Sequence, residues 1–388
     1  MIALIFWASV ALVGYTYVGY PILVTLIAHL VPTRDDPPAE TLEVTLVIAA
    51  YNEEAVISQK LEDTLSLDYP AELLQVIVAA DGSDDATADI VRGFADRGVE
   101  LVHRPERRGK MAALERAAHW ATGEVLIFSD ANNRLDPQAV RQLVIPFGDP
   151  TVGAATGRKT VAGEDGLGRS EGAYWRYEAH LRAMEDRLGC TVGVSGEIFA
   201  IRRDLFAPAP EGTINDDAWM ALAVTNDGWR VAYRPEAVSV ESVSSHLGDE
   251  LERRTRMVAG QYQMLQRGRL PWRRPLVLWM LVSHKVLRPL VPFGMIGAAA
   301  ATIVSLVTPG ESWWSLATPW NWAALAAQAT FYTLAVIGPD TGGGLARLAY
   351  LPRFLVGANT AAVRGLWRHL RGGQSATWRS ASRSEPIT

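Results

Sequence analysis

The hydrophobic and polar positions in the middle of the chain predict strands that alternate with helices. Runs of β-branched and apolar residues, typical of strands buried on both faces, are followed by stretches with helical periodicity. The predicted strands are 44–50, 74–80, 99–102 and 125–129, and the predicted helices are 54–65, 85–97, 110–120 and 138–147. This alternation predicts right-handed crossovers and a parallel sheet covered by helices on both faces.

Polar clusters follow three of the predicted strands. They are Tyr51–Glu53 after the first strand, Asp81–Ser83 after the second and Asp130–Asn132 after the fourth. Ligands of α/β proteins bind just outside the carboxyl ends of the strands. Each cluster alone would also fit a helix cap, because Asp, Asn and Ser are common there. Three clusters at one edge of the sheet favour a ligand site.

Three long apolar segments, 1–33, 289–310 and 312–339, contain no Asp, Glu, Lys or Arg. Each exceeds the roughly 20 residues that cross a bilayer as a helix. We expect 1–33 to be a transmembrane helix rather than a signal peptide, because its apolar part is too long and no basic leader precedes it. We expect 289–339 to form a transmembrane hairpin, with a buried core helix pair as the alternative. Its tryptophans suit the membrane boundary: Trp313, Trp314, Trp320 and Trp322.

Basic residues lie on both sides of the predicted hairpin, within 267–288 and 364–383. Cytoplasmic segments of membrane proteins are rich in Lys and Arg, so we expect both flanks in the cytoplasm and three crossings in all. The basic segment 269–288 and an amphipathic helix with a basic tail over 345–388 are expected at the membrane surface, although 345–363 could also span. The protein is therefore expected in the inner (cytoplasmic) membrane as a multi-pass protein, with a cytoplasmic domain over 40–268.

Composition excludes several classes of function. The formal net charge of −5 argues against nucleic-acid binding, which usually needs a basic surface. The single cysteine, Cys190, excludes an intrachain disulfide and a cysteine-based zinc site. The first strand ends in AYNEE and lacks the GxGxxG turn of dinucleotide-binding dehydrogenases.

Three motifs carry a family resemblance: VTLVIAAYNEE, AADGSDDAT and RGKMAALERA. With them, the segment from about Val44 to Leu265 resembles the family-2 inverting glycosyltransferases, which include membrane-bound synthases of cellulose-like and poly-N-acetylglucosamine-like polymers. The resemblance implies an α/β GT-A fold, with a Rossmann-like mixed sheet, flanking helices and transmembrane helices. It also implies a set of donor-binding residues: Ala50, Tyr51, Asn52, Glu53, Asp81, Lys110, Asp130 and Arg256.

The segment SDANN occupies the position of the DxD metal motif in that family. Transfer from a sugar nucleotide leaves a diphosphate, and a hard divalent cation held by oxygen ligands neutralises its charge. The resemblance therefore implies Mg²⁺ or Mn²⁺ bound by Asp130 and Asn132. Asn132 replaces the usual second acid and is the weaker ligand, and a helix cap is the alternative role of Asp130.

The segment INDDAWMALAV resembles the TED motif, with Asp216 at the Glu position and Asp217 at the Asp position. Inversion in a single displacement needs one base to take the proton of the acceptor hydroxyl. We expect Asp217 to be that base and Asp216 to be a partner whose charge raises the proton affinity of Asp217. The alternative is an acidic turn that caps a helix beginning at Ala218.

Two further segments concern the acceptor and the diphosphate. GVSGEIFAIRR resembles the acceptor-side segment, so Gly196 and Glu197 are acceptor-binding candidates, although an ordinary turn would also fit. RRTRM stands where polymer synthases carry QxxRW, so that only Arg256 is kept and Met257 replaces the tryptophan. Arg256 can still bind diphosphate oxygens, but the aromatic platform for a growing chain is lost.

The leading hypothesis is a metal-dependent, inverting transfer of a sugar from a nucleotide-diphosphate donor to a lipid-linked or membrane-proximal glycan. The resemblance implies that the donor is a UDP-sugar. One alternative is a processive exopolysaccharide synthase with an export partner. Another is a non-catalytic membrane scaffold with a GT-A fold, suggested by the altered DxD and QxxRW motifs. The motifs do not predict the sugar, the acceptor, the linkage or the oligomeric state.

Overall fold

The computed structural model describes residues 1–34, 41–162, 166–242, 247–268, 270–337 and 344–372. The chain divides into two compact units, which are described separately. The sheet unit comprises Thr25–Asp249 and Gln263–Met280, and the helical unit comprises Met1–Val24, Glu250–Tyr262 and Leu281–Gln374. The predicted basic tail from residue 373 onward and the end of the predicted hairpin at 338–339 lie outside the described residues.

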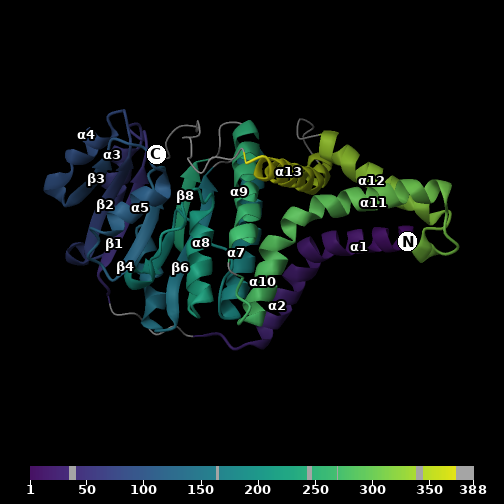
Figure 1. The fold of residues 1–388 in the computed structure, drawn as a ribbon, viewed down its shortest axis with the longest axis horizontal. Coiled ribbons are helices and arrows are strands. Elements are labelled where there is room, and N and C mark those ends of the chain that lie inside the picture. The colour runs from purple at the N-terminus through teal and green to yellow at the C-terminus, as the bar shows by residue number, and fades with distance from the viewer. Residues whose placement is uncertain (35–40, 163–165, 243–246, 269, 338–343, 373–388) are drawn as a thin grey trace. The chain divides into compact units, whose positions relative to one another are not determined.

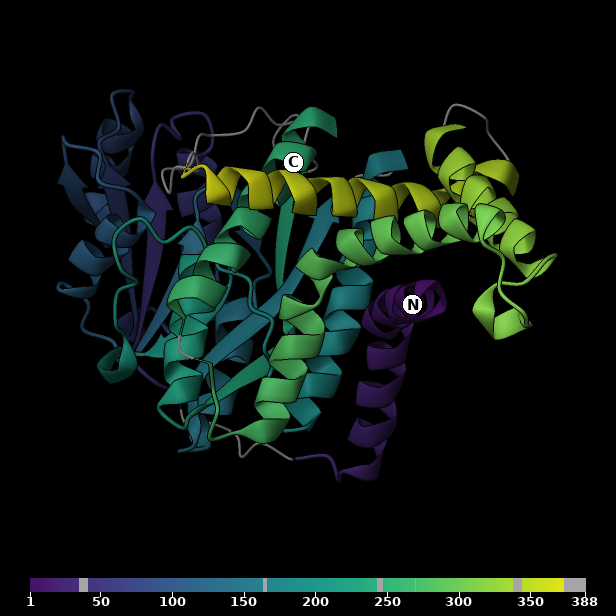
Figure 2. The same cartoon turned by 45° about the vertical axis from the view of Figure 1, so that its right-hand side comes forward.

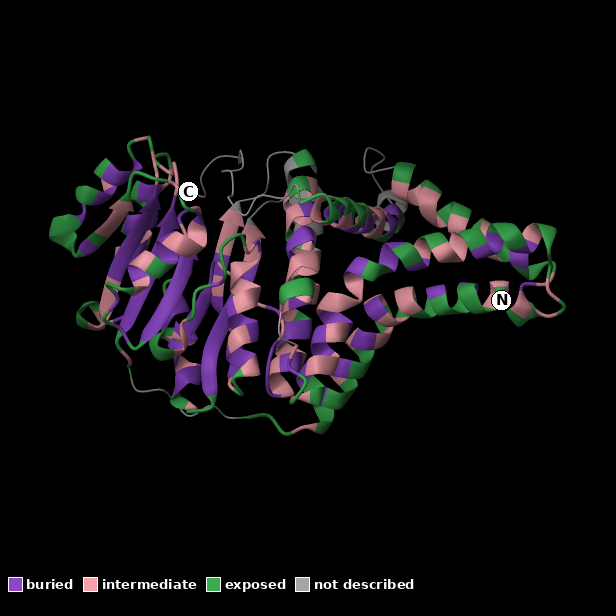
Figure 3. Cartoon of the chain, viewed as in Figure 1, coloured by how far each residue is buried: buried purple, intermediate pink, exposed green. Residues whose placement is uncertain are grey.

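An eight-stranded mixed sheet, in the order β3-β2-β1-β4-β7-β6-β8-β5, forms the centre of the sheet unit (Figure 1). The strands are β1 (Val44–Ala50), β2 (Leu74–Asp81), β3 (Val99–Arg104), β4 (Val125–Asp130), β5 (Asn133–Leu135), β6 (Val152–Ala162), β7 (Phe199–Arg202) and β8 (Arg230–Ser242). All residues of β1 are buried, which means that both faces of the sheet are covered at this strand (Figure 3).

The helices of this unit follow the strands closely. The α-helices are α3 (Ile57–Leu65), α4 (Thr87–Arg92), α5 (Lys110–Ala118), α6 (Ala139–Val144), α7 (Gly166–Arg187) and α8 (Asp216–Asn226). Short 3₁₀ turns cover Ala71–Leu73, Ala95–Arg97, Ile145–Gly148 and Arg203–Leu205. The predicted alternation of strands and helices over 44–147 is confirmed, with helices a few residues shorter than expected.

The strand register brings the predicted polar clusters to one edge of the sheet. Strands β1, β2, β3 and β4 are parallel, with Ala50 opposite Ala80 and Ala49 opposite Asp130. Asp81 follows Ala80 directly at the end of β2. The ends of three neighbouring strands therefore present Tyr51, Asp81 and Asp130 at the same edge.

Beyond β4 the sheet is no longer purely parallel. Strand β7 runs antiparallel to both β4 and β6, and β5 runs antiparallel to β8. The parallel arrangement predicted from the alternation is confirmed for β1–β4, and the mixed sheet implied by the family resemblance is confirmed for the sheet as a whole. Strand β5 consists only of Asn133–Leu135, so it has no apolar run that a sequence pattern could detect.

Helices make up the helical unit and its connections to the sheet unit. They are α1 (Ile2–Gly14), η1 (Tyr15–Gly19), α2 (Tyr20–Leu30), α9 (Leu247–Arg267), α10 (Pro275–Leu281), η6 (Val282–Val286), η7 (Arg288–Leu290), α11 (Val291–Val307), η8 (Trp313–Ser315), α12 (Trp320–Ile337) and α13 (Gly344–Leu370). Helices α1 and α11 lie side by side in both views (Figures 1 and 2). A Cβ atom added at Gly297 would lie 2.6 Å from Ser9 Oγ, so a small residue permits this close packing.

Two continuous helical segments, Ile2–Leu30 and Pro275–Val307, are long and apolar enough to cross a membrane. Their length and composition are compatible with membrane association. The second segment begins at Pro275 and so includes part of the basic segment expected over 269–288, whose interfacial location stays a prediction. The third expected crossing is helical over Trp320–Ile337 and is not among the two, and the number of crossings stays a prediction.

Candidate active site

The buried carboxylate of Asp81 holds the loop that precedes α5. Asp81 ends β2 and is 0% exposed. Its Oδ2 accepts a hydrogen bond from the Gly109 backbone N–H at 2.5 Å, and both of its oxygens accept from Arg108 N at 3.1 Å. A carboxylate that receives backbone N–H groups fixes a loop strongly. Asp81 therefore shapes the backbone next to Lys110, and its predicted contact with a nucleoside stays a prediction.

The tight approach of this loop to Gly82 leads to a prediction for Gly82→Ala. Gly82 has a φ of 70°, and an added Cβ would lie 2.7 Å from Arg107 N. Strain at positive φ costs about 1–3 kcal/mol, and the contact should also displace the loop beside Lys110. We expect Gly82→Ala to weaken nucleotide binding several-fold, as measured by calorimetry. Gly98→Ala is the matched control, since Gly98 has a φ of 86° and nothing within 4 Å of an added Cβ. Equal nucleotide affinity in the two variants would contradict the prediction.

The loop after β1 is tied to the loop after β2. The Asn52 side-chain amide donates to Asp84 Oδ1 at 2.5 Å, and the Glu53 N–H donates to Thr87 Oγ1 at 2.8 Å. The guanidinium of Arg107 lies 3.5 Å from the centroid of the Tyr51 ring. The predicted donor-binding residues that follow Ala50 therefore form one connected surface at the edge of the sheet.

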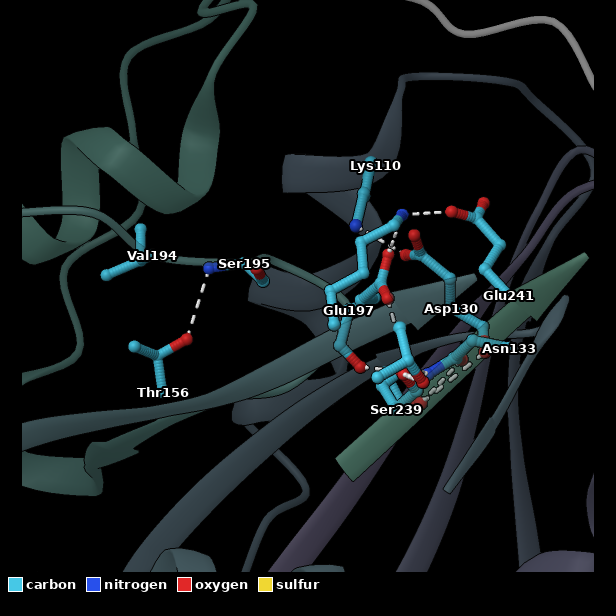
Figure 4. Close-up of polar contacts among 12 residues, drawn as sticks. Lys110, Asp130, Asn133, Thr156, Val194, Ser195, Glu197, Ser239 and Glu241 are labelled. Carbon is cyan, nitrogen blue, oxygen red and sulfur yellow. Dashed lines mark hydrogen bonds and ion pairs between the residues drawn. The ribbon is translucent and has the colours of Figure 1, made fainter. Parts of the chain in front are cut away.

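Lys110 joins the loop of Asp81 to the end of β4. It begins α5, and its Nζ lies 2.5 Å from Asp130 Oδ1 (Figure 4). Burial opposes the charged form of Lys110, but the carboxylates of Asp130, Asp216 and Asp217 outweigh it and raise its pKa above the ordinary value. The same lysine holds the pKa of Asp130 below its ordinary value, against the opposing effect of burial. Four predicted site residues from distant parts of the chain thus act on one another.

Asp216 and Asp217 form the first turn of α8, where the helix dipole favours negative charge. Asp217 Oδ1 accepts a hydrogen bond from Ala218 N at 2.7 Å. Burial raises the pKa of Asp217, and the neighbouring charge of Asp216 raises it further. Helix α8 begins at Asp216 with Asn215 as its N-cap, so Asp217 lies inside the helix and does not cap one that begins at Ala218. A raised pKa increases the proton affinity of the carboxylate, which is compatible with the predicted role as a base.

Gly196 packs directly against the Asp217 carboxylate. A Cβ atom added at Gly196 would lie 3.1 Å from Asp217 Oδ2, so any larger residue would have to displace the Asp217 side chain by a few tenths of an ångström. The loop is held from β6, since Ser195 N donates to Thr156 Oγ1 at 3.1 Å (Figure 4). The side chain of Arg182 in α7 also holds this loop, because it donates a hydrogen bond to Ser195 Oγ at 2.8 Å.

Glu197 is bound to neighbouring side chains. Its Oε2 lies 2.6 Å from Lys159 Nζ, and its Oε1 accepts from Ser239 Oγ at 3.0 Å (Figure 4). Lys159 also forms an ion pair with Glu241. The carboxylate of Glu197 therefore braces the loop, and a direct contact with an acceptor stays a prediction.

Comparison with known proteins identifies the part of the sheet unit that holds Lys110, Asp130 and Glu197. Residues 45–207 match the family described as Glycosyl transferase family 2. The chain carries a glycosyl transferase family 2 domain. Over 260 residues it is 27% identical to a probable glycosyltransferase of Bacillus subtilis. Over 242 residues it is 25% identical to a poly-beta-1,6-N-acetyl-D-glucosamine synthase of Staphylococcus aureus. The matches cover 61% and 60% of this chain but 59% and 58% of the relatives, so the chain spans about three fifths of their length.

A solved structure resembles most of the chain. It is a mannosyltransferase from Pyrobaculum calidifontis in complex with GDP-Man and Mn²⁺, with a TM-score of 0.71 and 26% sequence identity. The match covers 95% of this chain and 99% of that chain. It therefore extends beyond the family 2 domain into the helices of this protein. The GT-A fold expected from the sequence is confirmed.

The residues at the end of β4 fit a divalent cation that is also bound by the diphosphate of a sugar nucleotide. Among the described residues, no three His, Cys, Asp or Glu side chains are grouped to hold a metal. The protein offers the carboxylate of Asp130 and the amide of Asn132. Such a set suits a cation such as Mg²⁺, which is commonly held by one or two carboxylates together with waters and substrate phosphates. The donor diphosphate would then complete the coordination.

Sequence motifs did not predict several buried polar residues of the sheet unit. They are Lys60, Asn133, Lys159, Arg182 and Ser239, each less than a tenth exposed. Lys60 carried a usable signal, because it falls on the same face of α3 as the buried residues Ile57, Leu61 and Thr64. A lysine on the apolar face of a helix needs buried partners.

Arg256 lies in α9, in the part of that helix that belongs to the helical unit. Its predicted donor-binding role therefore stays a prediction. The altered RRTRM segment that contains it is helical throughout.

Proposed function

We propose that this chain transfers a sugar from a nucleoside diphosphate sugar to an acceptor hydroxyl, with inversion and with a divalent cation. The observation that supports this most strongly is the convergence of Lys110, Asp130 and the Asp216–Asp217 pair at the carboxyl edge of the sheet. Lys110 supplies a positive charge for the leaving diphosphate, and Asp130 supplies a ligand for the metal. Asp217 supplies the carboxylate that takes the proton of the attacking hydroxyl.

In the proposed reaction each protein group has a separate task. Asp217 accepts the proton of the acceptor hydroxyl as that oxygen bonds to the anomeric carbon, while the bond to the diphosphate breaks on the opposite face. Lys110 orients the Asp130 carboxylate and places a positive charge beside the leaving group. Bound by Asp130 and Asn132, Mg²⁺ or Mn²⁺ would neutralise the diphosphate. The small Gly196 lets its loop pack directly against the Asp217 carboxylate.

The nucleotide of the donor is a choice between two candidates. Family resemblance favours UDP, whereas the mannosyltransferase that matches most of the chain was solved with GDP-Man. The experiment that tests the function is nucleotide release by the purified protein in detergent or lipid, from GDP-Man, UDP-glucose and UDP-N-acetylglucosamine, with Mn²⁺, Mg²⁺ or EDTA. Cation-dependent release of one nucleotide supports the proposal. No release from any donor with any membrane acceptor fraction would favour the non-catalytic scaffold.

We further propose that the acceptor is a lipid-linked or membrane-proximal glycan and that the domain faces the cytoplasm. The two apolar helical segments support a membrane location. The match to a polymer synthase keeps a processive exopolysaccharide synthase, with an export partner, as the second candidate. Product length separates the two. A single added sugar per acceptor supports the first, and a ladder of long chains supports the second.

The pH profile of Asp216→Asn provides a test of the base. Asp217 must be ionised to accept a proton, so activity should fall as the pH drops through its raised pKa. Burial and the Asp216 charge both raise that pKa, and the substitution removes only the charge. We expect the acidic limb of kcat/KM to move to lower pH in Asp216→Asn. Asp227→Asn, at the far end of α8, is the control and should leave the limb in place. An unmoved limb in Asp216→Asn would show that another group sets it.

A further inference from the structure

The buried ammonium of Lys60 is bonded on both sides of the turn that carries the proposed metal ligands. Its Nζ donates to Ser129 Oγ at 2.8 Å, to the Asn133 carbonyl at 2.8 Å and to Asn133 Oδ1 at 3.0 Å. These contacts use all three N–H groups of the ammonium. Asp130 and Asn132 lie between the two residues that Lys60 holds.

The contacts continue from Asn133 to the loop beside the proposed base. The Asn133 side-chain amide donates to Ser239 Oγ at 2.7 Å and to the Glu197 carbonyl at 3.1 Å (Figure 4). Ser239 in turn donates to the Glu197 carboxylate. Glu197 follows Gly196, which packs on Asp217. One chain of buried hydrogen bonds therefore joins α3, the turn after β4 and the loop that contacts the Asp217 carboxylate.

The cost of burying the Lys60 charge indicates that this residue is not there for stability alone. Lys60 is 4% exposed, and burial lowers its pKa to about 7, while the charges of Asp130, Glu197 and Asp63 act in the opposite direction. A buried charge is costly even when it is paired, and an apolar side chain of similar volume is often at least as stable. A fully bonded buried charge does, however, fix the positions of its partners.

We propose that Lys60 is a positioning residue that holds the Ser129–Asn133 turn, so that Asp130 and Asn132 are placed to bind a divalent cation together with a nucleoside diphosphate. Through Asn133, Ser239 and Glu197 the same network sets this turn relative to the loop at Gly196. The inference rests on the proposed metal-dependent transfer. It adds a residue that does not touch the donor and acts through the ligands.

The test compares Lys60→Met with Leu61→Ala. Methionine fills a similar space without hydrogen bonds, whereas Leu61→Ala removes buried apolar volume from the neighbouring position of α3 without a polar contact. Binding of Mn²⁺ in the presence of GDP, and separately of UDP, is measured by calorimetry on the full-length protein, and unfolding is followed in parallel. We expect Lys60→Met to weaken Mn²⁺ binding at least tenfold and Leu61→Ala to change it less than twofold, although Leu61→Ala removes buried volume and is the less stable of the two.

Each outcome decides the inference. If Lys60→Met fails to fold, Lys60→Gln is measured in its place with the same expectation of weakened Mn²⁺ binding. Mn²⁺ affinity that is equal in the Lys60 variant and in Leu61→Ala would reduce Lys60 to a stability residue and overturn the inference, while the proposed function stands. A wild-type protein that binds no Mn²⁺ with either nucleotide would overturn the inference and the metal-dependent function together.

Discussion

Asp217→Asn is expected to lower the rate of sugar transfer by about 10³-fold, the middle of the range for loss of a general base. Asparagine keeps the size of the side chain and can still accept the hydrogen bond of Ala218 N, so α8 should begin at the same residue. It cannot take the acceptor proton at neutral pH. The effect should appear in kcat with an acceptor present, while the affinity for Mn²⁺ and nucleotide stays within a few-fold of the wild type.

Asp216→Asn serves as the control for this prediction, because it alters the neighbouring charge and leaves the proposed base in place. It should retain most of the transfer activity at a pH well above the acidic limb. Asp217→Asn with wild-type turnover would remove Asp217 from the role of base. A variant that loses nucleotide binding together with turnover would indicate a fault in folding or in donor binding, and would equally count against the assigned role.

Asp130→Ala is expected to abolish cation-dependent nucleotide binding and to lower transfer by about 100-fold or more. Metal stabilisation of a leaving phosphate supplies several kcal/mol, and about 1.4 kcal/mol corresponds to a tenfold change in rate. The substitution also leaves Lys110 without the carboxylate that lies 2.5 Å from its Nζ. The measurement is calorimetric titration of Mn²⁺ with GDP or UDP, followed by assays over a range of Mn²⁺ concentrations.

Asp136→Ala is the matched control, because Asp136 is an exposed acid six residues further along the chain, whose carboxylate accepts a hydrogen bond from Gln138 N ahead of α6. It should bind Mn²⁺ as the wild type does. Full activity of Asp130→Ala at ordinary Mn²⁺ concentrations would show that Asp130 is not a metal ligand. Activity that returns only at high Mn²⁺ would support a ligand role, since Asn132 and the diphosphate would still provide oxygens.

Much of the sheet unit could be predicted because its signals are local. The buried run Val44–Ala50 coincides with β1, and the predicted run at 74–80 lacks only Asp81 of β2. The polar residues that follow such strands must meet at one edge, because parallel strands share a direction. Motif resemblance then indicated Lys110, Asp130 and Asp217, and the structure brings these three into electrostatic contact.

What the sequence alone determined is therefore the order of the elements, the family resemblance and the residues that can carry the chemistry. Only the tertiary structure decided that the sheet turns antiparallel after β4, that Glu197 is bonded to Lys159 and Ser239, and that Lys60 reaches Asn133. The physical reason is that periodicity reports whether a side chain is buried. Its hydrogen-bond partners come from strands and helices far away in the chain, and only packing brings them within 3 Å.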